Sequence, residues 1–200
     1  MSRLATCVRT ARMDGNSMGA EASYSHNRTR AMTTAFLSLG SNEGDRLQHL
    51  RSAVGRLEAA DVATSRTSPV YRTEAHTLDP QESQPDYFNV VIEVETERPP
   101  ADLLALAKQI EREGGRDLSA QRWAPRPIDI DLLVVGRAVV RGKGLTLPHP
   151  RIGERRFVLQ PWADIAPNLV VPAPFESTVS ALLDRCADRA QLDPLCDALL

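Results

Sequence analysis

Cysteine is scarce in this chain, and its three copies are poorly spaced for disulfides or a metal centre. Cys7 lies near the start of the sequence, Cys186 and Cys196 lie near its end, and no two of them form a CxxC pair. A small secreted scaffold carries its cysteines in a denser and more regular pattern. We therefore expect reduced thiols, a cytoplasmic protein and no cysteine-bound metal.

Long apolar runs and a strong net charge are also missing. No run of about 18 apolar residues occurs, as a membrane-spanning helix would require. The formal net charge is only −2, whereas a surface built to coat nucleic acid is strongly basic. We expect neither a membrane protein nor a nucleic-acid-coating protein, and only a local basic patch remains open.

The 200 residues, of which 42% are hydrophobic and 25% charged, suffice for one soluble domain with a core. Residues 1–33 are rich in arginine and serine and poor in acidic residues. This composition superficially suits a transit peptide, but it is more typical of a disordered tail. We predict a disordered extension over residues 1–33 and a single domain over residues 34–200.

The phosphate-binding loop of Walker-type enzymes is absent. No GxxxxGK[ST] segment occurs, and the glycine turn at residues 40–44 has no lysine after it. Any triphosphate would therefore have to be held by arginines and a metal ion.

Apolar residues follow strand or helix periodicity in a regular order along the chain. Asp45 suits the N-cap of a first helix, and residues 99–100 and 114–115 suit the two ends of a second. The order strand, helix, strand, strand, helix, strand is typical of an α+β, ferredoxin-like split βαβ fold, with helices on one face of a mainly antiparallel sheet. From Pro148 onward we predict a short helical C-terminal tail. The predicted strands cover residues 34–39, 67–71, 88–96 and 128–135.

The segment RWAPRPIDIDLL, residues 122–133, contains the most informative pattern. In a strand, residues i and i+2 point the same way, so Asp129 and Asp131 share one face and Ile130 points to the other. Neighbouring carboxylates repel each other unless a cation lies beside them. Mg²⁺ suits such a pair, because it prefers one or two carboxylates together with phosphate oxygens and water. A polar, solvent-facing side of an edge strand explains the two residues equally well.

Three arginines precede the two aspartates and favour the metal interpretation. They are Arg116, Arg122 and Arg126, and prolines on both sides of Arg126 restrict its backbone. Guanidinium groups match phosphate oxygens and stay charged at physiological pH, as a phosphoryl-transfer site requires. For any single arginine a surface ion pair is the commoner role, but the set indicates an anionic substrate bound with a metal.

Two further regions carry candidate substrate-binding groups. In QPDYFN, residues 84–89, Tyr87 could stack on a planar ring and Asn89 could read a heterocycle edge with its carboxamide. Phe157 is a similar candidate, although core packing is the commoner role of such aromatic residues. His149 is held between two prolines, where it is either a structural histidine or part of a phosphate-facing loop.

Five motifs occur in order: SLGSN (38–42), YRT (71–73), QPDYFN (84–89), RWxPRxIDIDLL (122–133) and LPH (147–149). Together they resemble the 6-hydroxymethyl-7,8-dihydropterin pyrophosphokinase family of folate biosynthesis, from about residue 34 to residue 172. The resemblance implies a ferredoxin-like fold. It also implies ATP- and Mg²⁺-dependent transfer of the β,γ-diphosphate of ATP to the hydroxymethyl group of the dihydropterin, with release of AMP.

The resemblance implies a role for each matching position. Asp129 and Asp131 would bind two Mg²⁺ ions that bridge the ATP phosphates. Arg126 and Arg116 would face the transferred group. The partners would be ATP and 6-hydroxymethyl-7,8-dihydropterin, and a monomer is expected. The pterin side would consist of Thr73, Tyr87, Asn89, Phe157 and the loop residue Trp123, and the ATP side of Glu111, Thr146, His149 and Arg155.

Leu118, Ala124 and Pro150 depart from the common pattern of this family, which leaves the rate and the nucleotide affinity open but not the reaction type. The residues alone leave two other functions open. An RNA-binding ferredoxin-like domain could use the arginines as a basic patch, but the strand at 90–94 lacks the aromatic residues of an RNP motif. A metal-dependent nucleotidyltransferase could use the same paired aspartates and would release pyrophosphate instead of AMP.

Overall fold

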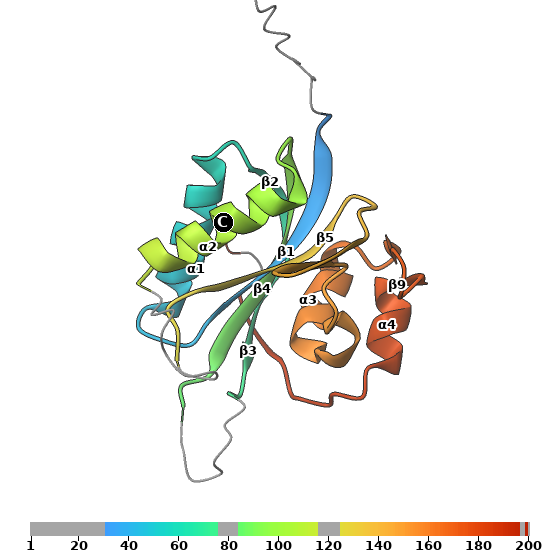
Figure 1. Ribbon diagram of the computed structural model, residues 1–200. Coiled ribbons are helices and arrows are strands. Elements are labelled where there is room, and N and C mark those ends of the chain that lie inside the picture. Colours follow the sequence, from blue (N-terminus) through green and yellow to red (C-terminus); the bar gives the residue numbers. More distant parts are fainter. Residues whose placement is uncertain (1–30, 76–83, 116–124, 197–198, 200) are drawn as a thin grey trace, which may run out of the picture.

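A central antiparallel sheet separates two layers of helices in the computed structural model, which describes residues 31–75, 84–115, 125–196 and 199 (Figure 1). The strand order is β10-β3-β4-β1-β5, and β2 also pairs with β4. The elements are β1 (Thr33–Ser41), α1 (Arg46–Glu58), β2 (Ala63–Thr67), β3 (Val70–Thr73), β4 (Tyr87–Thr96), α2 (Pro100–Glu113), β5 (Asp129–Val135), β6 (Val140–Gly142), β7 (Leu145–Leu147), η1 (Ile152–Glu154), α3 (Arg156–Ile165), β8 (Val170–Val171), β9 (Ser177–Thr178), α4 (Val179–Arg185) and β10 (Asp193–Cys196).

The predicted α+β, ferredoxin-like class is confirmed by this arrangement. β1 and β4 lie side by side in the middle of the sheet, and β5 and β3 flank them. α1 begins where expected, because the Asp45 carboxylate accepts the backbone N–H of Gln48 at 3.1 Å. α2 begins at Pro100 and ends before Gly114, also as the sequence indicates.

The strand predicted at residues 67–71 consists of two short strands, β2 and β3, and both pair with β4. The break falls at Ser68 and Pro69, because proline has no N–H to contribute to the ladder. Ser68 closes the gap on β4: its N–H donates to the Val91 carbonyl at 2.9 Å, and its hydroxyl accepts the Val91 N–H at 3.0 Å. Hydrogen bonding to β4 therefore continues across the break between β2 and β3.

Helices cover both faces of the sheet (Figure 1), and the prediction of helices on one face is therefore wrong. α1 and α2 pack against one side, where Leu37 and Val90 are fully buried. α3 and α4 pack against the other side, where Phe36, Val91 and Trp162 are buried. Neighbouring strand residues are apolar on both sides, and this requires two covering layers. None of the helices in the described ranges has the length and apolarity needed to cross a membrane.

The predicted helical tail is correct for α3 and α4 but wrong for the last element. Residues 193–196 form β10, which adds to the sheet edge beside β3 with Asp193 opposite Arg72. Leu199, which follows, is buried in the core under α1. The end of the described chain therefore returns to the sheet instead of continuing the helical layer.

An irregularity in β5 turns consecutive residues toward the same face. The pairing with β1 shifts between Phe36 and Leu37, so that Leu133 is an extra residue in β5. Leu133 and Val134 consequently both pack on the α3 side, while Leu132 packs on the α2 side. The carbonyl of Leu133 accepts the backbone N–H of His149 at 2.9 Å. This bulge therefore fixes the loop that carries His149.

Close packing at the end of α2 can be tested with two glycine substitutions. A Cβ atom on Gly114 would lie 2.8 Å from Cγ2 of Ile128, next to β5. We expect Gly114→Ala to lower the free energy of unfolding by about 1–3 kcal/mol because of this overlap. Gly55→Ala, within α1, meets no atom within 4 Å and should raise it by about 0.5–1 kcal/mol. Urea unfolding of both variants checks this, and equal effects would contradict the close contact.

Candidate active site

One cavity of about 520 Å³ opens where the ends of β1, β3, β4 and β5 meet the beginning of α3. Its wall joins carboxylate and guanidinium groups to two aromatic rings. The candidate residues from the sequence that lie in this wall are Thr73, Tyr87, Asn89, Arg126, Asp129, Asp131, Arg155 and Phe157. Folding therefore brings residues from distant parts of the sequence into one site.

The two aspartates of β5 point into this cavity from the same face of the sheet. Ile130, between them, is buried on the α2 side, so strand alternation turns both carboxylates toward the α3 side. Their side chains are 27% and 28% exposed, which leaves both open to a ligand. The expected geometry of a paired carboxylate site is therefore found.

Each of these carboxylates has an arginine beside it. Arg126 Nη1 lies 3.0 Å from Oδ2 of Asp129, and Arg155 Nη1 lies 2.8 Å from Oδ2 of Asp131. Asn42, from the SLGSN motif, fixes the backbone of Arg126: its Oδ1 accepts the Arg126 N–H at 2.8 Å, and its own N–H donates to the Arg126 carbonyl at 3.2 Å. The site therefore holds two carboxylates and two cations in a defined arrangement.

The two carboxylates fit a hard cation whose remaining coordination positions are filled by substrate and water. Among the described residues, no group of three or more histidine, cysteine, aspartate or glutamate side chains could enclose a metal by itself. Asp129 and Asp131 supply only oxygen ligands from one side. Mg²⁺ is commonly bound in this way, with phosphate oxygens and water in its remaining positions.

An ion pair on α2, between the partly exposed Lys108 and the buried Glu111, supports the strand between the two aspartates. β5 lies at the edge of the sheet, so the N–H and C=O of Ile130 point away from β1. Oε1 of Glu111 accepts this N–H at 2.7 Å, and Nζ of Lys108 lies 2.7 Å from Oε1 of Glu111 and 3.3 Å from the Ile130 carbonyl. The two side chains thus take the place of a neighbouring strand. Burial raises the pKa of Glu111, and Lys108 opposes that rise.

His149 and Asp131 lie close together, with Nε2 3.9 Å from Oδ2. Burial lowers the pKa of His149, so its imidazole is neutral at neutral pH. Its Nδ1 accepts the Arg151 N–H at 3.2 Å, which leaves the proton on Nε2, facing Asp131. Burial alone would raise the pKa of Asp131, but charged neighbours lower it, namely His149 when it is protonated, Arg155 and Lys108. With His149 neutral, the two cations keep Asp131 ionised.

The other half of the cavity carries a buried hydrogen-bonded pair of side chains and two aromatic rings. The Asn89 carboxamide donates to the Thr73 hydroxyl at 2.7 Å, and both residues are buried. Gly40 lies opposite Asn89 in the sheet, and a Cβ atom there would lie 3.2 Å from Oδ1 of Asn89. Tyr87 and Phe157 add rings from β4 and α3. The arrangement combines aromatic surface with fixed hydrogen-bonding groups.

The remaining predicted site residues lie elsewhere. Glu111 is buried under β5, and Thr146 is exposed on β7. Arg116 and Trp123 lie outside the described residues. The wall also contains residues that were not predicted as site residues, among them Lys108 and Asp188. Lys108 could have been noticed from its helical spacing to Glu111, whereas nothing in the sequence connects Asp188 to the site.

Replacement of Lys108 should destabilise the protein in a pH-dependent way. Lys108→Met removes the ammonium group that lies 2.7 Å from Glu111, whose pKa is already raised above 4.5, so this pKa rises further. While the buried carboxyl group of Glu111 is protonated, it carries no charge that could destabilise the variant. The destabilisation develops as the pH rises through the folded pKa of this group. We expect the free energy of unfolding to fall by about 1–3 kcal/mol at pH 8 and by less at pH 5.

Urea unfolding at both pH values measures this difference. Lys143→Met, in the exposed turn between β6 and β7, is the matched control and should change little at either pH. A loss for Lys108→Met that is the same at pH 5 and pH 8 would show that the charge of Glu111 is not involved.

Comparison with known proteins identifies relatives of the region that contains most of the site. Residues 36–167 match the sequence model of the 7,8-dihydro-6-hydroxymethylpterin-pyrophosphokinase family. A 2-amino-4-hydroxy-6-hydroxymethyldihydropteridine pyrophosphokinase of Bacillus subtilis is 42% identical over 132 residues, which are 66% of this chain and 77% of that protein. The Haemophilus influenzae enzyme of the same name is 34% identical over 162 residues, covering 80% of this chain and 98% of that protein.

Longer proteins contain a similar region. The folate synthesis bifunctional protein of Arabidopsis thaliana is 37% identical over 142 residues, 68% of this chain but only 28% of that protein. A crystal structure of a Plasmodium falciparum HPPK-DHPS triple mutant with pteroate superimposes with a TM-score of 0.61 at 15% identity, covering 80% of this chain and 44% of that chain. This likeness concerns the fold alone. From the family match and the two bacterial relatives, we conclude that the chain belongs to the 7,8-dihydro-6-hydroxymethylpterin-pyrophosphokinase family.

Proposed function

We propose that the protein transfers the β,γ-diphosphate of ATP to the hydroxymethyl oxygen of 6-hydroxymethyl-7,8-dihydropterin and releases AMP, as a step of folate biosynthesis. The observation that carries the proposal is the division of one cavity into two halves. A carboxylate and arginine half lies beside an aromatic and carboxamide half, because Gly40 of β1 pairs with Asp129 on one side and with Asn89 on the other. One site can thereby hold a metal-bound polyphosphate next to a planar heterocycle.

On the phosphate side, Asp129 and Asp131 are the candidate ligands for two Mg²⁺ ions. Bound Mg²⁺ would offset the negative charge of the triphosphate. Arg126 and Arg155 now lie beside these carboxylates, and guanidinium groups bind phosphate oxygens equally well. We infer that both arginines move from the carboxylates to the phosphates when metal and ATP bind together.

On the pterin side, the ring would lie between Tyr87 and Phe157. Asn89 and Thr73 would read its polar edge, since their side chains are buried and hold each other in place. A carboxamide offers one donor and one acceptor group, which matches a heterocycle with alternating ring nitrogens and exocyclic groups. This half of the cavity sets which alcohol is presented to the phosphate.

In the transfer itself, the hydroxymethyl oxygen attacks the β-phosphorus. The new O–P bond forms as the bond from the β-phosphorus to the AMP oxygen breaks, and the hydroxyl proton passes to water. No covalent intermediate with the protein is required. Positioning of the two substrates and neutralisation of the phosphate charge by arginines provide the acceleration expected of the protein.

The nucleotide would extend toward the β6–β7 hairpin and the His149 loop, where Thr146 and His149 are candidate contacts. Glu111 supports this side indirectly, because its carboxylate is bonded to Ile130. By family resemblance, Arg116 would face the transferred group and Trp123 would help to close the site.

We further propose that the active unit is a monomer in the cytoplasm, where ATP is abundant. The residues proposed for both substrates lie together in the wall of one cavity, so the proposed reaction requires no residue from a second copy. Light scattering coupled to size-exclusion chromatography measures the mass, and activity confined to a dimer would contradict this proposal.

Product analysis tests the function directly. We expect the protein, mixed with ATP, Mg²⁺ and the hydroxymethyl dihydropterin, to release one AMP for each pterin diphosphate formed. Asp129→Asn and Asp131→Asn should each lower turnover by at least about 10³-fold, because each removes one charge from the metal-binding pair. Nucleotide chromatography and circular dichroism measure product and fold.

Asp184→Asn, on the exposed side of α4, is the matched control and should keep full turnover. Release of pyrophosphate would instead indicate nucleotidyl transfer, and full activity in either site variant would remove that carboxylate from the metal site. Family membership already argues against an RNA-binding module.

A further inference from the structure

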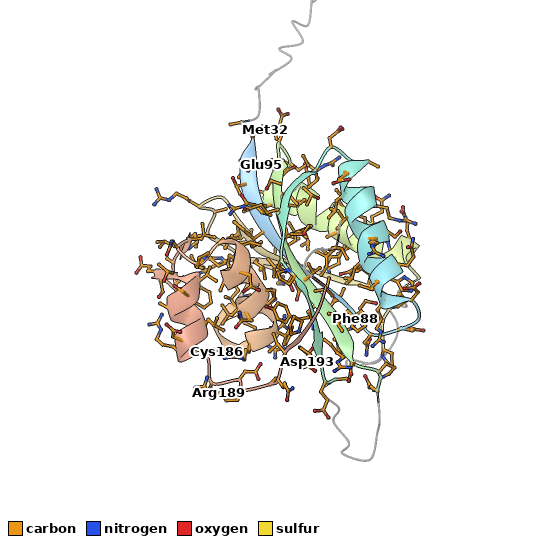
Figure 2. All side chains as sticks on the ribbon, turned by 180° about the vertical axis from the view of Figure 1, so that it is seen from behind. Met32, Phe88, Glu95, Cys186, Arg189 and Asp193 are labelled. Carbon is orange, nitrogen blue, oxygen red and sulfur yellow. The ribbon has the colours of Figure 1, made fainter. Side chains whose placement is uncertain are left out.

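The segment after α4 reaches the cavity from outside the region that defines the family. The family match ends at residue 167, whereas residues 186–196 run from the end of α4 to the sheet edge. Figure 2 shows this path through the labelled residues Cys186, Arg189 and Asp193. Asp188, within this segment, lines the cavity. The segment therefore adds to this site a residue that the family motifs do not include.

Asp188 caps the helix that carries part of the site. Its Oδ2 accepts the backbone N–H of Arg156, the first residue of α3, at 3.0 Å, and its Oδ1 accepts the Ala190 N–H at 2.8 Å. Arg155, at the N-cap position, makes no side-chain cap hydrogen bond. A carboxylate at this end of a helix satisfies a free N–H and opposes the positive end of the helix dipole. A distant aspartate thus supplies the cap that the local sequence lacks.

The capped end of α3 holds one residue for each half of the cavity. Arg155 donates to Asp131 at 2.8 Å on the metal side, and Phe157 lies in the wall on the pterin side. The Arg155 guanidinium lies 5.8 Å from the centre of the Phe157 ring. A shift of this helix end would displace both groups.

The other end of the segment is attached to the opposite wall. β10 pairs with β3, and Asp193 accepts a hydrogen bond from Arg72 at 2.8 Å. The next residue of β3 is Thr73, which holds the carboxamide of Asn89. Residues 186–196 therefore connect α3, which carries Phe157, with β3, which carries the partner of Asn89.

We propose that Asp188 is a positioning residue for the pterin substrate, because it fixes the beginning of α3 against the C-terminal segment and so sets the place of Phe157. This inference rests on the proposed function. It predicts that the loss of the cap weakens pterin binding, although Asp188 belongs to no family motif.

The far end of α3 provides a matched control. Asp164 accepts a hydrogen bond from the Tyr71 hydroxyl at 2.8 Å, which links the last turn of α3 to β3. Asp164→Asn alters an aspartate contact of the same helix, but Asp164 is not part of the cavity wall. It separates general loosening of α3 from loss of the cap.

The test compares Asp188→Ala, Asp188→Asn and Asp164→Asn by calorimetric titration with the hydroxymethyl dihydropterin and by steady-state kinetics. We expect Asp188→Ala to raise the Kd and the KM for the pterin about fivefold to tenfold, the effect of losing a helix cap. The asparagine carboxamide can still accept the Arg156 N–H, so Asp188→Asn should stay within about threefold of the wild type. Asp164→Asn should leave the Kd unchanged.

Three results would overturn the inference. The first is an unchanged Kd for Asp188→Ala. The second is an equal rise of the Kd in Asp188→Ala and Asp188→Asn, which would indicate a direct effect of charge on the ligand. The third is a rise of the Kd in Asp164→Asn as large as that in Asp188→Ala. If Asp188→Ala does not fold by circular dichroism, Asp188→Glu replaces it. Glutamate keeps the charge but displaces the acceptor, so the inference predicts a raised Kd and wild-type affinity would refute it. Absence of AMP from the wild type would refute the proposed function instead.

Discussion

The repulsion between Asp129 and Asp131 is the constraint around which this site is organised. Both carboxylates project from one face of an edge strand, and each is less than a third exposed. Such a pair is stable only when cations lie close by. In the described structure the cations are Arg126 and Arg155, whose backbones are fixed by Asn42 and by the beginning of α3. When metal-bound ATP enters the site, the metal ions would replace the arginines as partners of the aspartates. The phosphates would in turn become the partners of the arginines.

The strand that carries these carboxylates is supported on its open side by side chains. An edge strand has N–H and C=O groups without a strand partner, and at Ile130 these groups are occupied by Glu111 and Lys108. The bulge at Leu133 then offers a carbonyl to His149. The edge of the sheet, which many proteins only protect, here supports the half of the cavity that holds the two carboxylates.

Individual residues show how far sequence reasoning reached. The Asp45 cap, the proline start of α2 and the shared face of the two aspartates depend on contacts within a few residues, and all three are found. Three other features were predicted wrongly or not at all. They are the pairing of β2 and β3 with one strand, the second helical layer and the strand β10. These features depend on which surfaces meet, and periodicity alone cannot specify that.

The sequence by itself determined the chemistry of this protein, because the residue types and spacings of a few ordered motifs identify the family and the kind of substrate. Only the tertiary structure decided which side chains support them. Lys108 donates to the Ile130 carbonyl, and Asp188 caps α3, through contacts between segments far apart in the chain. Such contacts leave no local pattern, since they arise from the packing of α2 on β5 and from the return of the C-terminal segment to the sheet.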